Sequence, residues 1–148
     1  MDRQPLARLM IAATQATVDR LNEELARSGF PDARPSHGLA LLALGPEGST
    51  ASDLAERIAI TKQGAAKLAG RLEAGGLVRR RPHEQDGRAT VLRRTPKAER
   101  LLAAAERVQD EIERDWARRF GDRRVKELRK ALEAVVDDAP AGALQRLW

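Results

Sequence analysis

The chain has 148 residues, enough to bury one hydrophobic core, and its 33% charged and 42% hydrophobic residues are typical of a soluble helical protein. The absence of cysteine excludes disulfides, thiolate metal sites and cysteine redox chemistry. No apolar run approaches the ~20 residues that cross a bilayer, and the N-terminus lacks the apolar segment of a signal peptide, so we expect a cytoplasmic protein.

Positive charge is concentrated in one quarter of the chain. The net charge is +5, but the segment from Thr61 to Lys97 alone holds ten Lys or Arg residues against three Asp or Glu residues, a local net charge of +7. The rest of the chain is therefore slightly acidic. Such a footprint is typical of proteins that bind a polyanion.

Two helices are predicted before this basic segment. The first covers about residues 5–27, where Gly29 and Pro31 supply the stop signal. Its apolar positions are Leu6, Met10, Ala13, Thr17, Leu21 and Leu25. This long apolar stripe either packs on its own domain or lies in a subunit interface. A shorter helix opens at Pro35, with Leu39 and Leu42 on its apolar face and Leu41 and Leu44 as further candidates.

Residues 50–77 predict a helix-turn-helix. Thr50 forms a capping box with Asp53, ahead of a short helix buried through Leu54, Ala55 and Ile58. Thr61 is the next N-cap, and Gly75-Gly76 ends the second helix because glycine adopts the left-handed C-cap without strain. Two short helices joined by about three residues, the second one basic, fit this motif.

The second helix has a buried stripe and a basic face. Ala65, Leu68 and Leu72 recur at helical spacing and are expected to be buried. The opposite face carries Lys62, Gln63, Ala66, Lys67 and Arg71. This face suits the major groove of DNA, where Lys and Arg meet guanine or phosphate and Gln meets adenine. A plain solvated face is the alternative, and the surrounding basic segment favours DNA contact.

A hairpin follows. Residues 77–83 and 89–95 alternate as strands, and Asp86-Gly87 supplies the turn signal between them. Pro82 restricts its strand to a sheet edge. A basic hairpin directly after a helix-turn-helix is typical of a wing. Arg79, Arg80 and Arg81 either steer phosphates or form ordinary strand surface.

Two helices end the chain. Thr95-Pro96 begins the first, and Gly121 ends it. Its apolar stripe consists of Ala98, Leu101, Leu102, Ala105, Val108, Ile112, Trp116 and Phe120. Asp122 is expected to cap the last helix, which breaks between residues 137 and 142. Its inward positions are Val125, Leu128, Leu132 and Val135. The final residues, Leu147-Trp148 included, either dock as an apolar anchor or fray.

Signatures of catalysis and metal binding are missing. The chain has no P-loop, no nucleophile elbow and no convincing carboxylate pair, so neither an enzyme nor a cofactor is predicted. His37 and His83 are the only histidines, and their spacing predicts no metal site. His37 with Trp116 is a candidate effector site, although structural packing is the favoured role of both histidines.

Several motifs together point to a family. They are Asp53-Leu54-Ala55-Glu56-Arg57, Ile60-Thr61-Lys62-Gln63, Leu68 to Leu72, Glu73-Ala74-Gly75-Gly76-Leu77-Val78-Arg79-Arg80, Asp86-Gly87-Arg88, Val91, Thr95-Pro96-Lys97 and the helix from Val125. In this order the chain resembles the MarR family of bacterial transcriptional regulators. The resemblance implies a mainly α fold with a small β-hairpin wing: an N-terminal dimerisation arm (1–34), a winged helix-turn-helix (35–97) and a C-terminal dimerisation region (98–148), intertwined in one domain.

The resemblance also implies function. A homodimer would bind a pseudo-palindromic operator in double-stranded DNA, as a repressor rather than an activator. Binding of a small, often aromatic effector would make the dimer release the DNA. Its recognition helix would run from Thr61 to Arg71, with DNA contacts from Thr61, Lys62, Gln63, Lys67 and Arg71. Asp86 would orient the wing and Arg88 would enter the minor groove, with an Asp86–Arg88 salt bridge as the alternative.

Some positions depart from the family pattern. Ala66 stands where many relatives have Ser or Thr, and Arg94 and Ala98 replace the usual leucine and glycine. Gly64 and Gly70 each cost roughly 1 kcal/mol of helix stability relative to Ala. A winged-helix protein-interaction module, or a non-specific DNA-binding protein, therefore remains the alternative.

Overall fold

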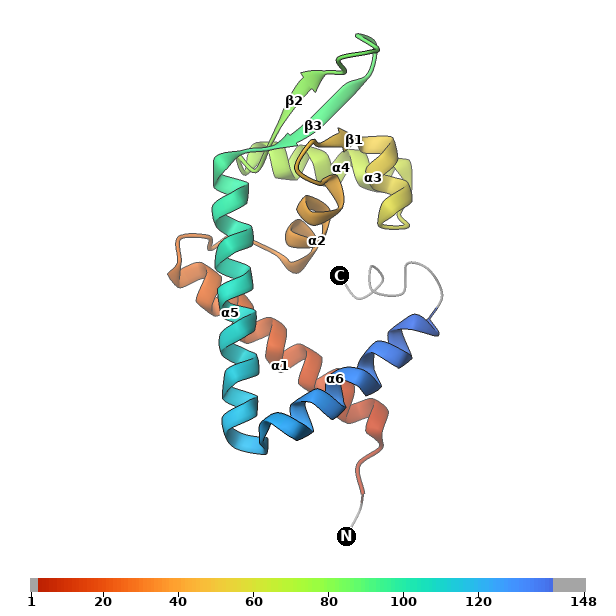
Figure 1. The fold of residues 1–148 in the computed structure, drawn as a ribbon. Helices are drawn as coiled ribbons and strands as arrows, with labels where there is room; N and C mark the ends of the chain where they lie inside the picture. The colour runs from red at the N-terminus through yellow and green to blue at the C-terminus, as the bar shows by residue number, and fades with distance from the viewer. Residues whose placement is uncertain (1–2, 140–148) are drawn as a thin grey trace.

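The computed structural model describes residues 3–139 and is mainly helical, with one small antiparallel sheet, as predicted (Figure 1). The elements in chain order are α1 (Leu6–Arg27), α2 (Pro35–Leu44), β1 (Ser49–Thr50), α3 (Ala51–Arg57), α4 (Lys62–Ala74), β2 (Val78–Pro82), β3 (Thr90–Arg94), α5 (Pro96–Phe120) and α6 (Asp122–Asp137). None of the helices within residues 3–139 is long and apolar enough to cross a membrane.

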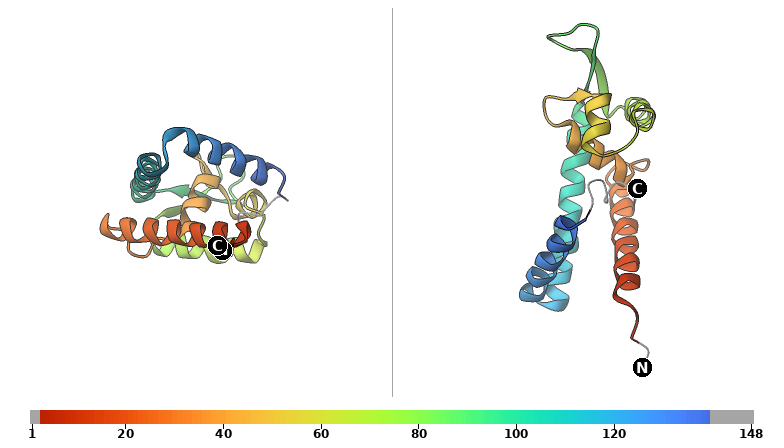
Figure 2. Two further views of the ribbon diagram at one scale, coloured as in Figure 1. Left: turned by 90° about the horizontal axis from the view of Figure 1, so that it is seen from below. Right: turned by 90° about the vertical axis from the view of Figure 1, so that its right-hand side faces the viewer.

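The molecule has two ends joined by α5. At one end α2, α3, α4 and the sheet pack together, and the β2–β3 hairpin projects beyond them (Figure 1). Towards the other end α1 crosses α5 and α6 packs against its far part, and both extend away from it (Figure 2). The helix-turn-helix with its wing therefore lies away from the free parts of the terminal helices.

The sheet has the strand order β1-β3-β2, so Pro82 lies on an edge strand, as predicted. Strand β1 was not predicted from the sequence. It pairs Ser49 with Leu92 and Thr50 with Val91. Gly48, immediately before it, has φ +78°, and a Cβ there would lie 2.4 Å from the carbonyl oxygen of Leu92. The close approach of these two segments therefore requires glycine.

The core lies between the winged-helix elements and the first half of α5. Its largest fully buried side chains are Leu41, Leu44, Leu54, Leu72, Val78 and Leu92. In α2 the prediction was wrong for Leu42, which is 65% exposed, whereas Leu41 and Leu44, the further candidates, are buried. Leu39, also predicted on the apolar face, is only partly buried. The residues from Leu39 to Leu44 are all apolar, so their spacing could not indicate which side faces the core.

The last two helices expose part of their predicted apolar stripes. Phe120 is 46% exposed, and on α6 only Val125 is buried, whereas Leu128, Leu132 and Val135 are 39–57% exposed. Those inward positions were therefore wrong for the isolated chain, because α6 runs beyond the core and no element within residues 3–139 covers these side chains. Asp122 is the first residue of α6 rather than its cap, which is Gly121 at φ +91°. The predicted anchor at Leu147-Trp148 lies outside the described residues.

Candidate nucleic-acid interface

Side-chain caps and a tight turn hold α4 against α3. The hydroxyl of Thr50 accepts a hydrogen bond from the Asp53 N–H (3.1 Å), and that of Thr61 accepts one from the Gly64 N–H (2.9 Å). Ala59 adopts φ +53° in the turn, where the Ile60 N–H donates to the carbonyl oxygen of Ala55 (3.0 Å). These bonds fix the crossing of the two helices.

Gly64 serves this cap. A Cβ on Gly64 would lie 3.1 Å from the Thr61 hydroxyl oxygen, which is tighter than an ordinary contact. The glycine therefore makes room for the capping hydroxyl at the start of α4. Gly70, by contrast, would place a Cβ in open space.

The C-terminal end of α4 is tied to α5. Gly76, at φ +71°, ends the helix, and the Leu77 N–H donates to the Leu72 carbonyl (2.8 Å) in a Schellman motif. Of the predicted glycine pair, only Gly76 is left-handed, since Gly75 has φ −78°. The Thr95 hydroxyl donates to the Gly76 carbonyl (2.6 Å), so the end of α4 and the start of α5 form one junction.

The outer face of α4 is exposed and basic. Ala65, Ala69 and Leu72 are buried, Leu68 is partly buried, and Lys62, Gln63, Ala66, Lys67 and Arg71 all face solvent. Within residues 3–139, no carboxylate forms an ion pair with Lys62, Lys67 or Arg71. The three positive charges on this face therefore remain uncompensated.

Ion pairs do compensate other cations of the basic segment. Arg80 pairs with Glu73 (2.7 Å), Arg93 with Glu84 (3.6 Å) and Arg94 with Glu99 (2.9 Å). The Arg94 side chain is only 12% exposed and also donates to the Leu41 carbonyl (3.4 Å), so it belongs to the protein interior. Within residues 61–97 the uncompensated charge is thus left on the outer face of α4 and on Arg79, Arg81, Arg88 and Lys97, whose ammonium donates to the Gly75 carbonyl (2.9 Å).

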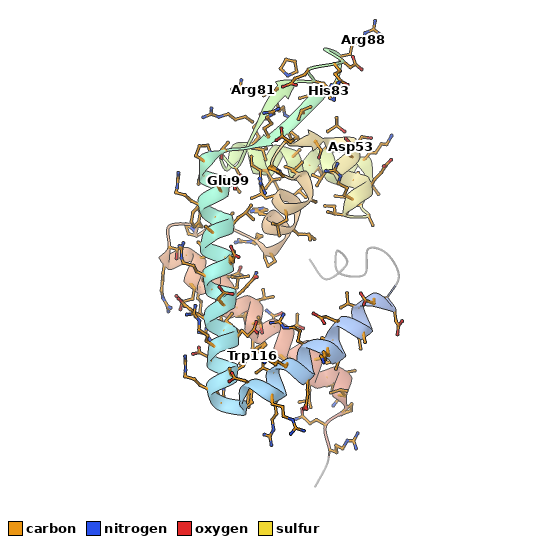
Figure 3. The ribbon with its side chains drawn as sticks, viewed as in Figure 1. Asp53, Arg81, His83, Arg88, Glu99 and Trp116 are labelled. Carbon is orange, nitrogen blue, oxygen red and sulfur yellow. The ribbon has the colours of Figure 1, made fainter. Side chains whose placement is uncertain are left out.

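The wing tip presents Arg88. The Asp86 carboxylate accepts a hydrogen bond from the backbone N–H of Arg88 (3.1 Å), and the Asp86 carbonyl accepts one from Ala89 (3.0 Å). Asp86 therefore shapes the turn through the backbone, and the described structure shows no ion pair between the two side chains. The Arg88 side chain lies at the far end of the hairpin (Figure 3).

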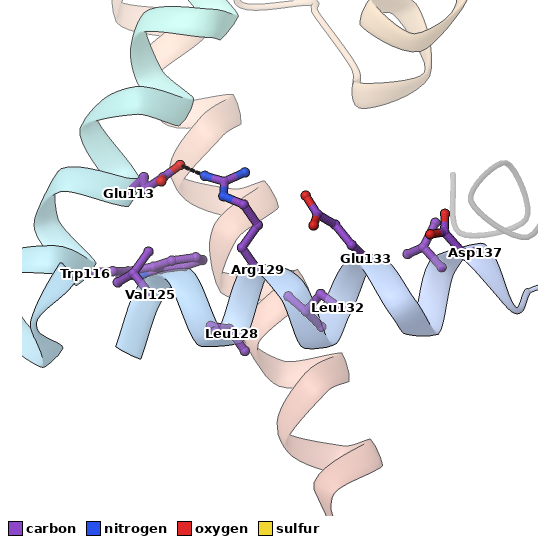
Figure 4. A pocket seen from close by; sticks show the side chains of 9 residues that line it. Glu113, Trp116, Val125, Leu128, Arg129, Leu132, Glu133 and Asp137 are labelled. Atoms are coloured by element: carbon purple, nitrogen blue, oxygen red, sulfur yellow. Dashed lines mark ion pairs between the residues drawn. The ribbon is translucent and has the colours of Figure 1, made fainter. Parts of the chain in front are cut away.

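The candidate effector residues do not line a common pocket. Trp116 lies in a groove of about 350 Å³ between α5 and α6, which an ion pair between Glu113 and Arg129 crosses (Figure 4). His37 is not among the lining residues; its Nδ1 accepts a hydrogen bond from the Arg34 N–H (3.3 Å) at the start of α2. Within residues 3–139 no cluster of His, Cys, Asp or Glu could hold a metal ion.

We expect His37 to make folding stability pH-dependent. Burial, with the charges of Arg34 and Arg71, lowers the pKa of His37. The unfolded chain therefore binds a proton at a higher pH than the folded chain does, so stability present at neutral pH is lost as the pH falls below about 6.5. Urea unfolding at neutral and mildly acidic pH should show this loss, and His37→Asn should reduce it. An equal loss in the variant would contradict the assignment.

Comparisons with known proteins agree with this geometry. A sequence model of the MarR family matches residues 28–89. No curated protein matches the sequence. Among solved structures, the S. aureus MepR–DNA complex is 18% identical, with a TM-score of 0.72 over 93% of this chain and 100% of that one.

Two further solved structures extend the likeness. The reduced form of MarR from E. coli is 20% identical, with a TM-score of 0.72 over 91% of this chain and 98% of that one. BldR from Sulfolobus solfataricus is 22% identical, with a TM-score of 0.64 over 90% of this chain and 94% of that one. At these identities the likeness establishes the fold. The resemblance predicted from the sequence is therefore confirmed: residues 28–89 match the MarR family, and the chain has the fold of the MarR and MepR structures.

Proposed function

We propose that this chain is a cytoplasmic, sequence-specific DNA-binding repressor that acts as a homodimer on a pseudo-palindromic operator and responds to a small-molecule effector. The observation that carries the proposal is the uncompensated basic face of α4, continued by Arg88 at the wing tip. The fold shared with MepR, which is known in a complex with DNA, supports it.

The proposed contacts divide between bases and phosphates. Lys62 and Gln63 lie in the first turn of α4, where a recognition helix reaches base edges. Lys67 and Arg71 follow on the same exposed face and are assigned to phosphates. The Thr61 hydroxyl accepts from Gly64 and can still donate its own proton to a phosphate oxygen. Arg88 is assigned to the minor groove, and Asp86 holds its backbone.

Exposed apolar residues support the homodimer. On α1, Leu6, Leu9 and Ile11 are 48–71% exposed, and α6 exposes a second stripe at Leu128 and Leu132. Apolar surface of this extent is typical of an interaction surface. A second copy of the chain would cover both helices and place two α4 helices about 34–36 Å apart, one turn of DNA.

Fluorescence anisotropy tests the DNA assignment. DNA from upstream of the protein's own gene should bind in preference to a scrambled duplex, and the preference should survive moderate salt. We expect Gln63→Ala to reduce the preference about tenfold, as for loss of one base contact. Arg88→Ala should weaken binding to both duplexes with little change in preference.

The alternatives give different results in the same measurement. Equal binding to both duplexes that collapses steeply with salt indicates phosphate contact alone and a non-specific DNA-binding protein. No binding to either duplex, or to sites selected from random DNA, favours a protein-interaction module. Unchanged affinities in Lys62→Ala, Gln63→Ala and Arg88→Ala would reject the residue assignments.

A further inference from the structure

His83 lies at the start of the wing loop and is partly buried (Figure 3). Its Nδ1 lies 3.1 Å from the backbone nitrogen of Gln85 and 3.2 Å from that of Asp86, and both N–H groups donate to it. The backbone N–H of His83 donates to the Ala89 carbonyl across the hairpin (2.9 Å). An Nδ1 that accepts hydrogen bonds belongs to a neutral imidazole with its proton on Nε2.

A chain of hydrogen bonds runs from this ring to the wing tip. The imidazole fixes the amides of Gln85 and Asp86, and Asp86 in turn accepts from the N–H of Arg88 (3.1 Å) and of Ala89 (3.0 Å). Residues 83–89 make no strand ladder of their own between β2 and β3. The imidazole Nδ1 is therefore the side-chain acceptor that ties the first half of the loop, and Asp86 carries its effect to the backbone of Arg88.

We infer that His83 is the positioning residue for Arg88 and that only its neutral imidazole can hold the wing in its DNA-binding form. Protonation places a hydrogen on Nδ1, and that N–H then points at the two N–H groups that it had accepted. The ring must leave its position and the loop loses both bonds. This inference rests on the proposed DNA-binding function.

A positioning role for His83 predicts that DNA affinity falls in acid, which is the opposite of what the added charge alone would give. An added positive charge on the wing should strengthen binding to DNA. If the ring instead positions Arg88, acid weakens binding because the wing loosens. The charged groups around the ring are mixed: Glu84 and Asp86 lie in the loop, Arg81 on β2, Arg88 at the tip, and Arg93 on β3, paired with Glu84 (3.6 Å).

Two substitutions separate the roles of the ring. In His83→Asn the amide oxygen takes the place of Nδ1, so an acceptor remains that does not take up a proton. In His83→Gln the amide reaches the place of Nε2 and leaves the Nδ1 position without an acceptor. If the ring only fills space, both substitutions should lower DNA affinity alike. If the acceptor matters, His83→Asn should retain the affinity and His83→Gln should lose it.

The experiment measures the affinity for the selected operator DNA by anisotropy between about pH 8 and about pH 5, the range in which histidine titrates. We expect the wild type to weaken about fivefold to tenfold more than His83→Asn as the pH falls, as for the loss of two loop hydrogen bonds. At the upper pH, His83→Asn should match the wild type and His83→Gln should be weaker. His37→Asn, which removes the other histidine, should keep the wild-type pH dependence.

Binding that strengthens in acid in the wild type but not in His83→Asn would overturn the inference, as would wild-type affinity in His83→Gln. Nitrogen-15 NMR of the free protein decides the matter without DNA. The ring of His83 should show the Nε2–H tautomer, and the amides of Gln85 and Asp86 should shift with pH in the wild type alone. If DNA does not bind at all, the proposed function fails while NMR still tests His83. An Nδ1–H tautomer would overturn the role of His83 and leave DNA binding standing.

Discussion

Leu41→Ala is expected to destabilise the protein by about 3 kcal/mol, whereas Leu42→Ala should change its stability by less than about 0.5 kcal/mol. The two residues are neighbours on α2 and have the same side chain. Leu41 is fully buried and Leu42 is 65% exposed. Truncation of Leu41 loses the transfer free energy of the removed atoms and leaves a cavity among Leu44, Leu54 and the other core side chains.

Urea unfolding followed by circular dichroism at one fixed protein concentration measures both variants. A fixed concentration is needed because dimerisation adds to apparent stability. Both substitutions introduce alanine into the same helix, so helix propensity cancels in the comparison. Equal losses in the two variants would contradict the assignment of α2's buried side.

Leu132→Glu is expected to convert the proposed dimer into monomers, with the dissociation constant raised at least about a hundredfold, since an unpaired charge in an apolar interface costs several kcal/mol. Leu132 lies in the middle of the exposed stripe of α6, between Leu128 and Val136, and lines the groove beside α5. A glutamate there would be in water in the monomer and desolvated in the dimer. The affinity for operator DNA should fall as the dimer is lost.

Ala134→Glu is the matched control. Ala134 is exposed on the opposite side of α6 and does not line the groove, and the substitution adds the same charge. Sedimentation at micromolar concentration should show a dimer for the wild type and Ala134→Glu, and a monomer for Leu132→Glu. A wild-type monomer would reject the dimer itself. A dimer in all three proteins would place the interface elsewhere.

Elements with a local chemical signal were predicted well from the sequence. Thr50, Thr61 and Thr95 each begin a helix with a side-chain cap, and Gly76 ends α4. Such signals act within a few residues and depend little on distant partners, although Asp122, predicted as a cap, is the first residue of α6 instead. The stretches whose structure depends on distant partners were predicted less well: β1 has only two residues, and the uniformly apolar α2 carries no directional pattern.

The candidate interface was predicted as a set of residues but not as a distribution of charge. The sequence shows ten cations between Thr61 and Lys97, yet only the fold brings Glu73 to Arg80 and Glu99 to Arg94. The acceptor role of His83 was equally hidden, since a histidine three residues before an aspartate has no distinctive spacing. Ion pairing depends on the folded geometry. Only the fold therefore shows which cations on α4 have no carboxylate partner.

The junction between α4 and α5 makes the long helix a lever. The Thr95 hydroxyl donates to the Gly76 carbonyl, and the Lys97 ammonium donates to the Gly75 carbonyl. The winged helix-turn-helix and the first turn of α5 must therefore move together. With 25 residues α5 is about 37 Å long, so a tilt of about 5° at its far end moves the winged helix-turn-helix by about 3 Å. In the proposed dimer on DNA, a small change where α5 meets α1 and α6 would thus produce a larger change in the distance between the two winged helix-turn-helix regions.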